Sequence, residues 1–305
     1  MKLSIVVPLW NKRELMRACL LSLRSSLVSF DGEAEVIVVD DGSTDGAQDL
    51  VPEEFPQFEQ LSNRFNRGFA VSANRGLESA QGEFLLLLNS DTEVSAEALQ
   101  QMVQLLEQNE TWDGLAPRLV DRAGRTQASC MDWPRLATAF FFGTPMERWC
   151  PNSNEMQRYF LRDFDHESPR ADVQPPASCW LLRRRAWRQV GAFDESLELF
   201  FNDVDWTLRL KQLGGALQYR PEISLLHIGG ASTVARTDFV ERWQTDRLRF
   251  YRKHHGALGG VLVKACVSWT FADWWTRRAF QPSTAETRAE GTNVRRAFTQ
   301  FLRSA

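Results

Sequence analysis

Short apolar runs alternate with stretches of helical spacing over the first part of the chain. Largely apolar runs, typical of buried strands, occur at 3–8, 35–39 and 84–88, and a further short strand fits 58–61. Apolar residues recur at helical spacing over 12–29 and 69–80, and Ser95 is placed to cap a further helix that ends near Leu106. This order predicts an α/β fold with a mostly parallel, doubly wound sheet and helices on both of its faces.

The pattern is weaker after Gly114. Residues 121–176 are rich in proline and show little periodicity, so they predict long loops and a hairpin. Regular structure is then expected as a strand at 177–183, helices at 184–190 and 203–213, and strands at 217–220 and 223–227. Helical spacing from Thr237 onward predicts a helical C-terminal extension at 236–305 after a first domain at 1–235.

Charge is distributed unevenly along the 305 residues. Thirteen Lys and Arg stand against six Asp and Glu from Arg236 to Ala305, which leaves −10 on the rest of a chain whose net charge is −3. A basic tail suits an anionic partner, either a membrane surface or a phosphate-bearing substrate, and an ordinary solvated helix face is the alternative. No nucleic acid partner is indicated, because the body of the chain is acidic.

The tail also interleaves basic and aromatic residues, at Arg242, Trp243, Arg247, Arg249, Phe250, Tyr251, Arg252 and Lys253. This pattern fits a helix that lies on an anionic membrane, and it fits equally a helix that packs on the first domain. The most apolar segment, 257–272, contains Lys264 and is too short to span a bilayer. With no signal peptide at the N-terminus, the expected location is the cytoplasm, with peripheral contact at the inner face of the cell membrane as an option.

The five cysteines, Cys19, Cys130, Cys150, Cys179 and Cys266, form no CxxC pair. Neither a zinc site nor a disulfide framework is therefore indicated, and free thiols are expected. Cys19 falls on a helical apolar stripe and Cys179 in a strand-like run, so both are predicted to be buried.

Acidic and polar residues follow two of the predicted strands. Asp40 and Asp41 come directly after the run at 35–39, and Asn89, Ser90 and Asp91 follow the run at 84–88. Because ligands of open α/β sheets bind at the carboxyl ends of the strands, these residues predict a site for a metal and a phosphorylated, polar ligand. The alternative is that they only terminate strands, as Asp and Asn often do.

Further motifs accompany these two in a fixed order. They are Pro8-Leu9-Trp10-Asn11, Val39–Asp45, Asn66-Arg67-Gly68-Phe69, Leu88-Asn89-Ser90-Asp91, Gly191–Glu195, Asn202–Asp205 and His227-Ile228-Gly229-Gly230-Ala231-Ser232. Over about residues 3–255 the chain resembles the family 2 glycosyltransferases, and among them the bacterial rhamnosyltransferase-like members. The resemblance implies a Rossmann-like GT-A fold. It also implies inverting transfer of rhamnose or a related hexose from a nucleotide-diphosphate sugar to a glycan or lipid-diphosphate-linked acceptor, as in cell-surface polysaccharide synthesis.

The resemblance divides the first domain into a nucleotide-sugar half at 1–115 and an acceptor and catalytic half at 116–235. In the first half, Asp40 and Asp41 are expected to bind the nucleoside, and one of them reads a pyrimidine ring. Pro8 and Asn11 would line the same pocket at the end of the first strand. Strand termination remains the alternative for all four residues.

The diphosphate and the sugar are expected to contact the start of the helix at 69–80. Free N–H groups there and the small Gly68 would let an anion approach, and Arg67 adds positive charge. Asn66 and Asn74 are predicted to bond sugar hydroxyls, and the resemblance places Ser90 in the same donor site.

A divalent cation, Mn²⁺ or Mg²⁺, is expected to neutralise the diphosphate that leaves during transfer. Asp91 supplies the hard oxygen ligand that such ions prefer. Family members often have Asp at the position of Asn89, which would leave Asp91 as the one anionic ligand. His227 resembles the family's second metal contact, and an imidazole ligand favours Mn²⁺.

Asp203 is the candidate catalytic base, because an inverting transfer needs one carboxylate that takes the proton of the acceptor hydroxyl. Its alternative is a plain acid at a helix start. Asp205 should point elsewhere on the helix, and Trp206 is expected in the core in preference to stacking on a sugar. Family members usually have Glu at the position of Asn202.

The sequence bears on three alternative functions. The Asn residues at 89 and 202 motivate a degenerate module that binds a nucleotide sugar without turnover. A nucleotidyltransferase is disfavoured, because no Gly-rich loop bearing Arg or Lys follows the first strand. A processive synthase is disfavoured because Phe239 stands where that group's Gln-x-x-Arg-Trp motif has Gln.

Overall fold

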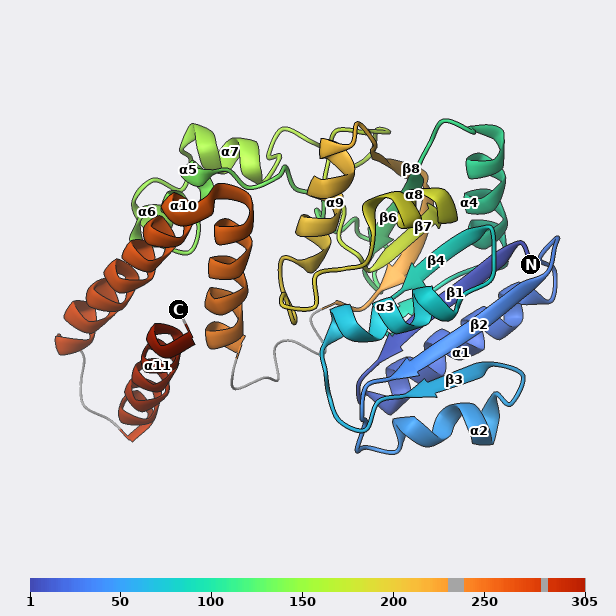
Figure 1. Cartoon of the computed structure of the whole chain (residues 1–305), viewed down its shortest axis with the longest axis horizontal. Coiled ribbons are helices and arrows are strands. Elements are labelled where there is room, and N and C mark those ends of the chain that lie inside the picture. Colours follow the sequence, from blue (N-terminus) through green and yellow to red (C-terminus); the bar gives the residue numbers. More distant parts are fainter. Residues whose placement is uncertain (230–238, 281–284, 305) are drawn as a thin grey trace. The chain divides into compact units, whose positions relative to one another are not determined.

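The computed structural model describes residues 1–229, 239–280 and 285–304 (Figure 1). Residues 230–232 of the His227 motif and Thr237 lie outside the described residues. Two compact units are formed. The first comprises 1–131, 164–198 and 202–235, and the second comprises 132–163, 199–201 and 236–305. Within the described part of the chain, no helix has the length and hydropathy needed to cross a bilayer.

The first unit is built on an eight-stranded sheet of order β3-β2-β1-β4-β7-β6-β8-β5. Its strands are β1 (Leu3–Leu9), β2 (Ala34–Asp40), β3 (Glu59–Ser62), β4 (Phe84–Leu88), β5 (Thr92–Glu93), β6 (Gly114–Val120), β7 (Cys179–Arg183) and β8 (Leu217–His227). The pairs β1–β2, β1–β4, β2–β3 and β6–β8 are parallel, whereas β4–β7, β6–β7 and β5–β8 are antiparallel.

Helices cover both faces of this sheet, as the alternating pattern predicted. One apolar cluster joins the sheet to α1 (Arg13–Leu27), α2 (Leu50–Glu54) and α4 (Ala96–Gln108). The other joins it to α3 (Phe69–Ser79), α8 (Arg184–Val190) and α9 (Asn202–Gln212). Strands β1, β2 and β4 contribute to both clusters, because alternate side chains of a strand point to opposite faces. The expected α/β fold is confirmed, and its parallel half at β3-β2-β1-β4 brings the carboxyl ends of β1, β2 and β4 to one edge.

The pattern located most elements of the first unit to within a few residues. The Ser95 side chain caps α4 as expected, since its Oγ accepts a hydrogen bond of 3.1 Å from the Ala98 N–H. Two strands expected at 217–220 and 223–227 are instead one strand, β8, which contains Pro221. The register of the β6–β8 pairing shifts between Pro117 and Arg118. A bulge therefore interrupts the pairing at this point, while β8 continues as one strand.

The second unit is helical. The prediction of loops and a hairpin over 121–176 is wrong for its middle part, which forms α5 (Leu136–Phe141), α6 (Pro145–Trp149) and α7 (Asn154–Tyr159). Helices of five or six residues are too short to display a helical period. The tail is helical as predicted, with α10 (Phe239–Ala279) and α11 (Ala285–Ser304). Gly256, at φ 61° and ψ −151°, breaks α10 into two helical segments.

All five cysteines are free thiols. Cys19 and Cys179 are buried in the sheet core as predicted, and burial raises the pKa of both thiols.

Candidate active site

Asp41 ties the loop at 63–68 to the end of β2. Its Oδ1 accepts hydrogen bonds from the Asn63 amide (2.8 Å) and from the Arg67 N–H (2.9 Å). Its Oδ2 accepts the Gly68 N–H at 2.8 Å, and the carboxylate is almost completely buried. The backbone carbonyl of Asp40 adds a bond from the Asn63 N–H at 2.7 Å. The acid pair therefore organises a second loop and does more than terminate a strand.

The end of β1 lies against the same turn. Asn11 adopts a left-handed conformation with φ of 58°. Its N–H donates to Ser43 Oγ, and its Oδ1 accepts the Thr44 N–H, both at 2.8 Å. Pro8 pairs in register with Val39 at the same end of the sheet. The structure thus brings Pro8 and Asn11 beside the turn that Asp40 and Asp41 begin.

Two glycines allow the loop at 63–68 to approach its neighbours. A Cβ on Gly42, where φ is 72°, would lie 2.6 Å from Phe65 Cα, and one on Gly68, where φ is 95°, would lie 2.6 Å from the Glu198 carbonyl oxygen. The expectation of free N–H groups for an anion is wrong at Arg67 and Gly68, because Asp41 already accepts both. The Arg67 side chain remains exposed, and Asn66 is half-buried.

Asn74 is committed to the chain itself. Its amide nitrogen donates to the Phe193 carbonyl (3.0 Å) and to Glu195 Oε1 (3.2 Å), and its Oδ1 accepts the Phe193 N–H at 2.8 Å. Both N–H groups of the amide are therefore used, and the residue is buried. In place of the expected sugar contact, we assign Asn74 the positioning of the Gly191–Glu195 segment.

We expect Asp41→Ala to lower the free energy of unfolding by roughly 2–4 kcal/mol, because the Asn63 amide and the N–H groups of Arg67 and Gly68 lose their acceptor. Urea denaturation measures this, with Asp49→Ala as the matched control. Asp49 is exposed, and its side chain bonds only the neighbouring Gln48, so that change should stay within about 0.5 kcal/mol. Equal midpoints for the two variants would show that the Asp41 contacts contribute nothing.

Asp91 and His227 lie close together where β5 pairs with β8. Thr92 and His227 are antiparallel partners in β5 and β8, and the Ile228 N–H donates to the Asp91 carbonyl at 3.0 Å. His227 Nε2 lies 3.5 Å from Asp91 Oδ1, and the side chains are 13% and 12% exposed. The chain therefore brings this predicted pair together from positions far apart in the sequence.

Gln127 determines which nitrogen of His227 carries the proton. The Gln127 amide nitrogen donates to the His227 carbonyl at 2.8 Å, so its Oε1 faces His227 Nδ1, also at 2.8 Å. Since Oε1 only accepts, Nδ1 must carry a proton. Burial lowers the pKa of His227, while the Asp91 charge opposes that shift. In the neutral form of the ring, Nε2 is the nitrogen whose lone pair points to Asp91.

With the ring neutral, His227 Nε2 and the Asp91 carboxylate are two acceptors that face each other, which suits a shared cation. Ligands at about 2.1 Å from one ion lie roughly 3.0–3.6 Å apart at ordinary coordination angles, which includes the 3.5 Å observed here. Within the described residues, no group of three His, Cys, Asp or Glu is placed to hold a metal. Asp91 and His227 thus have the spacing that two ligands of one divalent ion would need.

Asn89 connects this pair to the candidate base. Its N–H donates to the Ser178 carbonyl at 2.9 Å, and its amide reaches Ser178 Oγ at 3.4 Å. The neighbouring Ala177 N–H in turn points to Asp203 Oδ2 at 3.4 Å. Ala177 and Ser178, which stand just before β7, therefore lie between Asn89 and Asp203. Ser90 and Asp91 follow directly after Asn89 in the chain.

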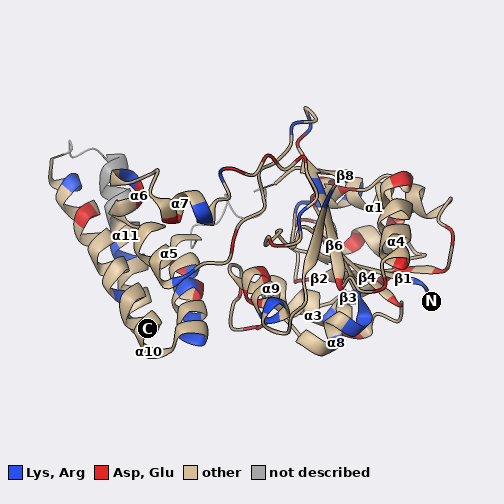
Figure 2. Cartoon of the chain, turned by 90° about the horizontal axis from the view of Figure 1, so that it is seen from above, with Lys and Arg blue, Asp and Glu red and all other residues tan. Residues whose placement is uncertain are grey.

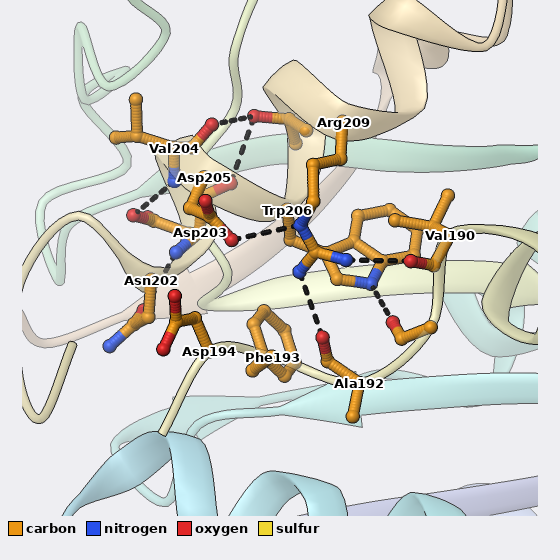
Figure 3. Close-up of polar contacts among 12 residues, drawn as sticks. Val190, Ala192, Phe193, Asp194, Asn202, Asp203, Val204, Asp205, Trp206 and Arg209 are labelled. Atoms are coloured by element: carbon orange, nitrogen blue, oxygen red, sulfur yellow. Dashed lines mark hydrogen bonds and ion pairs between the residues drawn. The ribbon is translucent and has the colours of Figure 1, made fainter. Parts of the chain in front are cut away.

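Asp203 stands at the start of α9 and is half-buried (Figure 3). Burial raises the pKa of its carboxyl group, although hydrogen bonds from the N–H groups of Val204 and Ala177 act in the opposite direction. The Val204 N–H lies 2.8 Å from Oδ1. A carboxylate with a raised pKa is a stronger base than an exposed aspartate, which suits the abstraction of a hydroxyl proton.

The neighbours of Asp203 have structural roles. Asp205 points away and pairs with Arg209 at 2.9 Å, and Arg209 also donates to the carbonyls of Val190 and Ala192 (Figure 3). Trp206 is fully buried as predicted, and its indole N–H donates to the Gly191 carbonyl at 2.9 Å. The Asn202 amide reaches the Leu197 carbonyl at 3.4 Å, so Asn at this position serves the loop before α9.

Two glutamines of this site carry no signal in the sequence. Gln127 holds His227 in place through two hydrogen bonds, and the Gln174 side chain lowers the pKa of Asp203, against the effect of burial. Both lie in the aperiodic segment 121–176, carry no charge and belong to none of the recognised motifs.

The family Glycosyl transferase family 2 matches residues 4–191 of the chain. A relative from Mycobacterium tuberculosis, N-acetylglucosaminyl-diphospho-decaprenol L-rhamnosyltransferase, is 24% identical over 222 residues, which cover 69% of this chain and 72% of that protein. The putative glycosyltransferase EpsH of Bacillus subtilis is 32% identical over 107 residues, but these cover 33% of this chain and only 29% of EpsH.

Two solved structures share the fold. The mannosyltransferase PcManGT of Pyrobaculum calidifontis, in complex with GDP-Man and Mn²⁺, aligns with a TM-score of 0.53 and 15% identity, over 99% of this chain and 87% of that one. TarS 1–349 of S. aureus, in complex with UDP, aligns with a TM-score of 0.51 and 19% identity, over 100% of this chain and 81% of that one. The expected GT-A architecture is therefore confirmed.

Proposed function

The chain belongs to glycosyltransferase family 2, and on that premise we propose that it transfers rhamnose or a related hexose from a nucleotide-diphosphate sugar to a lipid-diphosphate-linked glycan, with inversion. The single observation that carries the proposal is the Asp91–His227 pair, in which Nε2 and Oδ1 lie 3.5 Å apart at the end of the sheet that also holds Asp40 and Asp41. The lipid-linked acceptor and the rhamnose type are suggested by the Mycobacterium tuberculosis relative.

In this proposal the end of the sheet binds the donor. Asp40 is the candidate for reading the base, because Asp41 already accepts three hydrogen bonds from the chain. Pro8 and Asn11 line the nucleoside pocket, and Arg67, Asn66 and Ser90 are assigned to the diphosphate and sugar. The donor half is then 1–115, and 116–235 supplies the base and the acceptor contacts.

Asp91 and His227 would hold a divalent ion, which would neutralise the charge that develops on the leaving nucleoside diphosphate. Mn²⁺ is favoured over Mg²⁺, because one of the two ligands is an imidazole. Gln127 positions His227 for this role by keeping the proton on Nδ1.

Asp203 acts on the acceptor. Its carboxylate takes the proton of the acceptor hydroxyl as that oxygen bonds the anomeric carbon, and the bond from the anomeric carbon to the diphosphate oxygen breaks. One base suffices for a single displacement, so the configuration at the anomeric carbon inverts. Asn at 202 leaves Asp203 as the one base of this step, because an amide takes no proton.

A panel of nucleotide sugars, tested for thermal stabilisation with and without Mn²⁺, identifies the donor. One donor should raise the melting temperature, and more so with Mn²⁺, because a ligand that binds only the folded state stabilises it. The anomeric configuration of the product, read by NMR, should be opposite to that of the donor. Donor binding with neither hydrolysis nor transfer to any lipid-linked acceptor would instead favour a binding module without turnover.

A further inference from the structure

The second segment of α10, after the break at Gly256, exposes an uncharged face. Exposed positions recur every three or four residues, at Leu258, Val261, Ala265, Ser268, Ala272, Trp275 and Ala279. This spacing places them on one side of the helix over roughly 30 Å. Leu258 and Val261 are each 65% exposed, and Phe280 just beyond the helix is 90% exposed. We call this surface the Leu258–Ala279 face.

Positive charge borders the Leu258–Ala279 face. Arg252 and Lys253 precede it and are exposed, Lys264 lies between its positions, and Arg277 and Arg278 stand near its end. Lys and Arg recur along α10 in Figure 2. The one acidic residue from Ala257 to Phe280 is Asp273, and Arg148 and Arg277 each pair with it at 2.9 Å. The surroundings of the face are therefore basic.

Aromatic side chains accompany this charge. Trp269 lies 5.6 Å from the ring of the exposed Trp149, and the Arg148 guanidinium stands over Trp149. The Arg295 guanidinium stands over Trp275 at 4.5 Å. Tryptophan beside basic residues, next to an apolar face, is typical of helices that lie in the interface of a bilayer.

We propose that the Leu258–Ala279 face docks on an anionic lipid bilayer, with its apolar side chains among the acyl chains and its basic border at the headgroups. Charge complementarity favours lipid over a second copy of this chain, because two such borders would repel each other. The choice of occupant rests in part on the proposed function, since a lipid-diphosphate-linked acceptor is held at a membrane surface.

Sedimentation of the full chain with lipid vesicles tests the docking. Wild type should bind vesicles of phosphatidylglycerol and phosphatidylcholine, and bind pure phosphatidylcholine more weakly. The double change Leu258→Glu and Val261→Glu should weaken binding to the anionic vesicles by about tenfold or more, because two anions enter the docking face. The matched control, Gln104→Glu with Gln108→Glu on exposed positions of α4, changes the charge equally and should bind as wild type does.

Several outcomes would overturn the docking proposal. Wild type that sediments with neither vesicle, or equal binding by the two double variants, would remove lipid as the occupant. A dimer of the wild type that the Leu258 and Val261 changes dissociate would assign the face to a second copy. Donor hydrolysis in the absence of vesicles reports on the proposed function separately, and the Leu258→Glu, Val261→Glu variant should retain it at the wild-type rate.

Discussion

Asp203→Asn should lower kcat by roughly 10²–10⁴-fold while the Kd for the donor stays within about threefold. The amide has the shape of the carboxylate and keeps an acceptor for the Val204 N–H, but it cannot take a proton. Transfer assays give kcat, and calorimetry with the nucleoside diphosphate and Mn²⁺ gives binding. Asp172→Asn is the matched control, because Asp172 is an exposed acid whose surface pair with Lys211 contributes little.

The raised pKa of Asp203 gives this prediction a second measurement. Since the base works when ionised, kcat of the wild type should fall with decreasing pH through a pKa above that of an ordinary aspartate. The folded state holds the proton more tightly than the unfolded state, so stability is lost as pH rises through the folded-state pKa. Asp203→Asn removes this loss, and its melting temperature relative to wild type should therefore increase from acid to neutral pH.

Two results would contradict the assignment of Asp203. Unchanged kcat in Asp203→Asn would assign the base to another residue. A variant whose donor affinity and kcat fall together would indicate that Asp203 binds the donor and does not act on the acceptor.

Sequence patterns located the candidate site where a local signal exists. Asp40, Asp41 and Asp91 were identifiable because each follows a continuous apolar run, and such runs end at one edge of a parallel sheet. The roles of Asp203 and His227 are predicted only by the resemblance of their motifs to the family, because a helix start or a strand end does not by itself indicate a catalytic or metal-binding role. The α/β fold was predictable for the same reason, since the apolar runs of β1, β2 and β4 alternate with segments of helical spacing.

Long-range contacts explain what could not be predicted. The sequence predicts Asn74 as a sugar ligand, but its amide bonds the backbone of Phe193, which is 119 residues away. Gln127 is 100 residues from His227, and an isolated uncharged amide gives no pattern. The helices α5 to α7 were missed because each is shorter than two turns, and packing within the second unit, not periodicity, specifies them.

We expect Asp91→Asn to lower kcat/KM by roughly 10²–10⁴-fold, because a bound cation contributes several kcal/mol to the stabilisation of the leaving diphosphate. The amide removes the only anionic ligand of the proposed pair. Mn²⁺ binding in the presence of the nucleoside diphosphate, followed by electron paramagnetic resonance, should weaken by at least about tenfold. This readout does not depend on turnover. Asp121→Asn is the control, since Asp121 is bonded to Arg125 in an exposed turn.

The substitution Gln127→Met tests the orientation of His227 separately from the charge of Asp91. Gln127→Met keeps the size of the side chain but loses both bonds to His227, so Nδ1 no longer fixes the ring. Mn²⁺ affinity should fall by about 10–100-fold, as for other residues that orient a ligand. Gln108→Met, on an exposed position of α4, should leave it unchanged. If Asp91→Asn and Gln127→Met both bind Mn²⁺ as wild type does, the facing lone pairs of Asp91 and His227 do not hold the ion. Transfer would then have to rely on Arg67 and the start of α3 to neutralise the diphosphate.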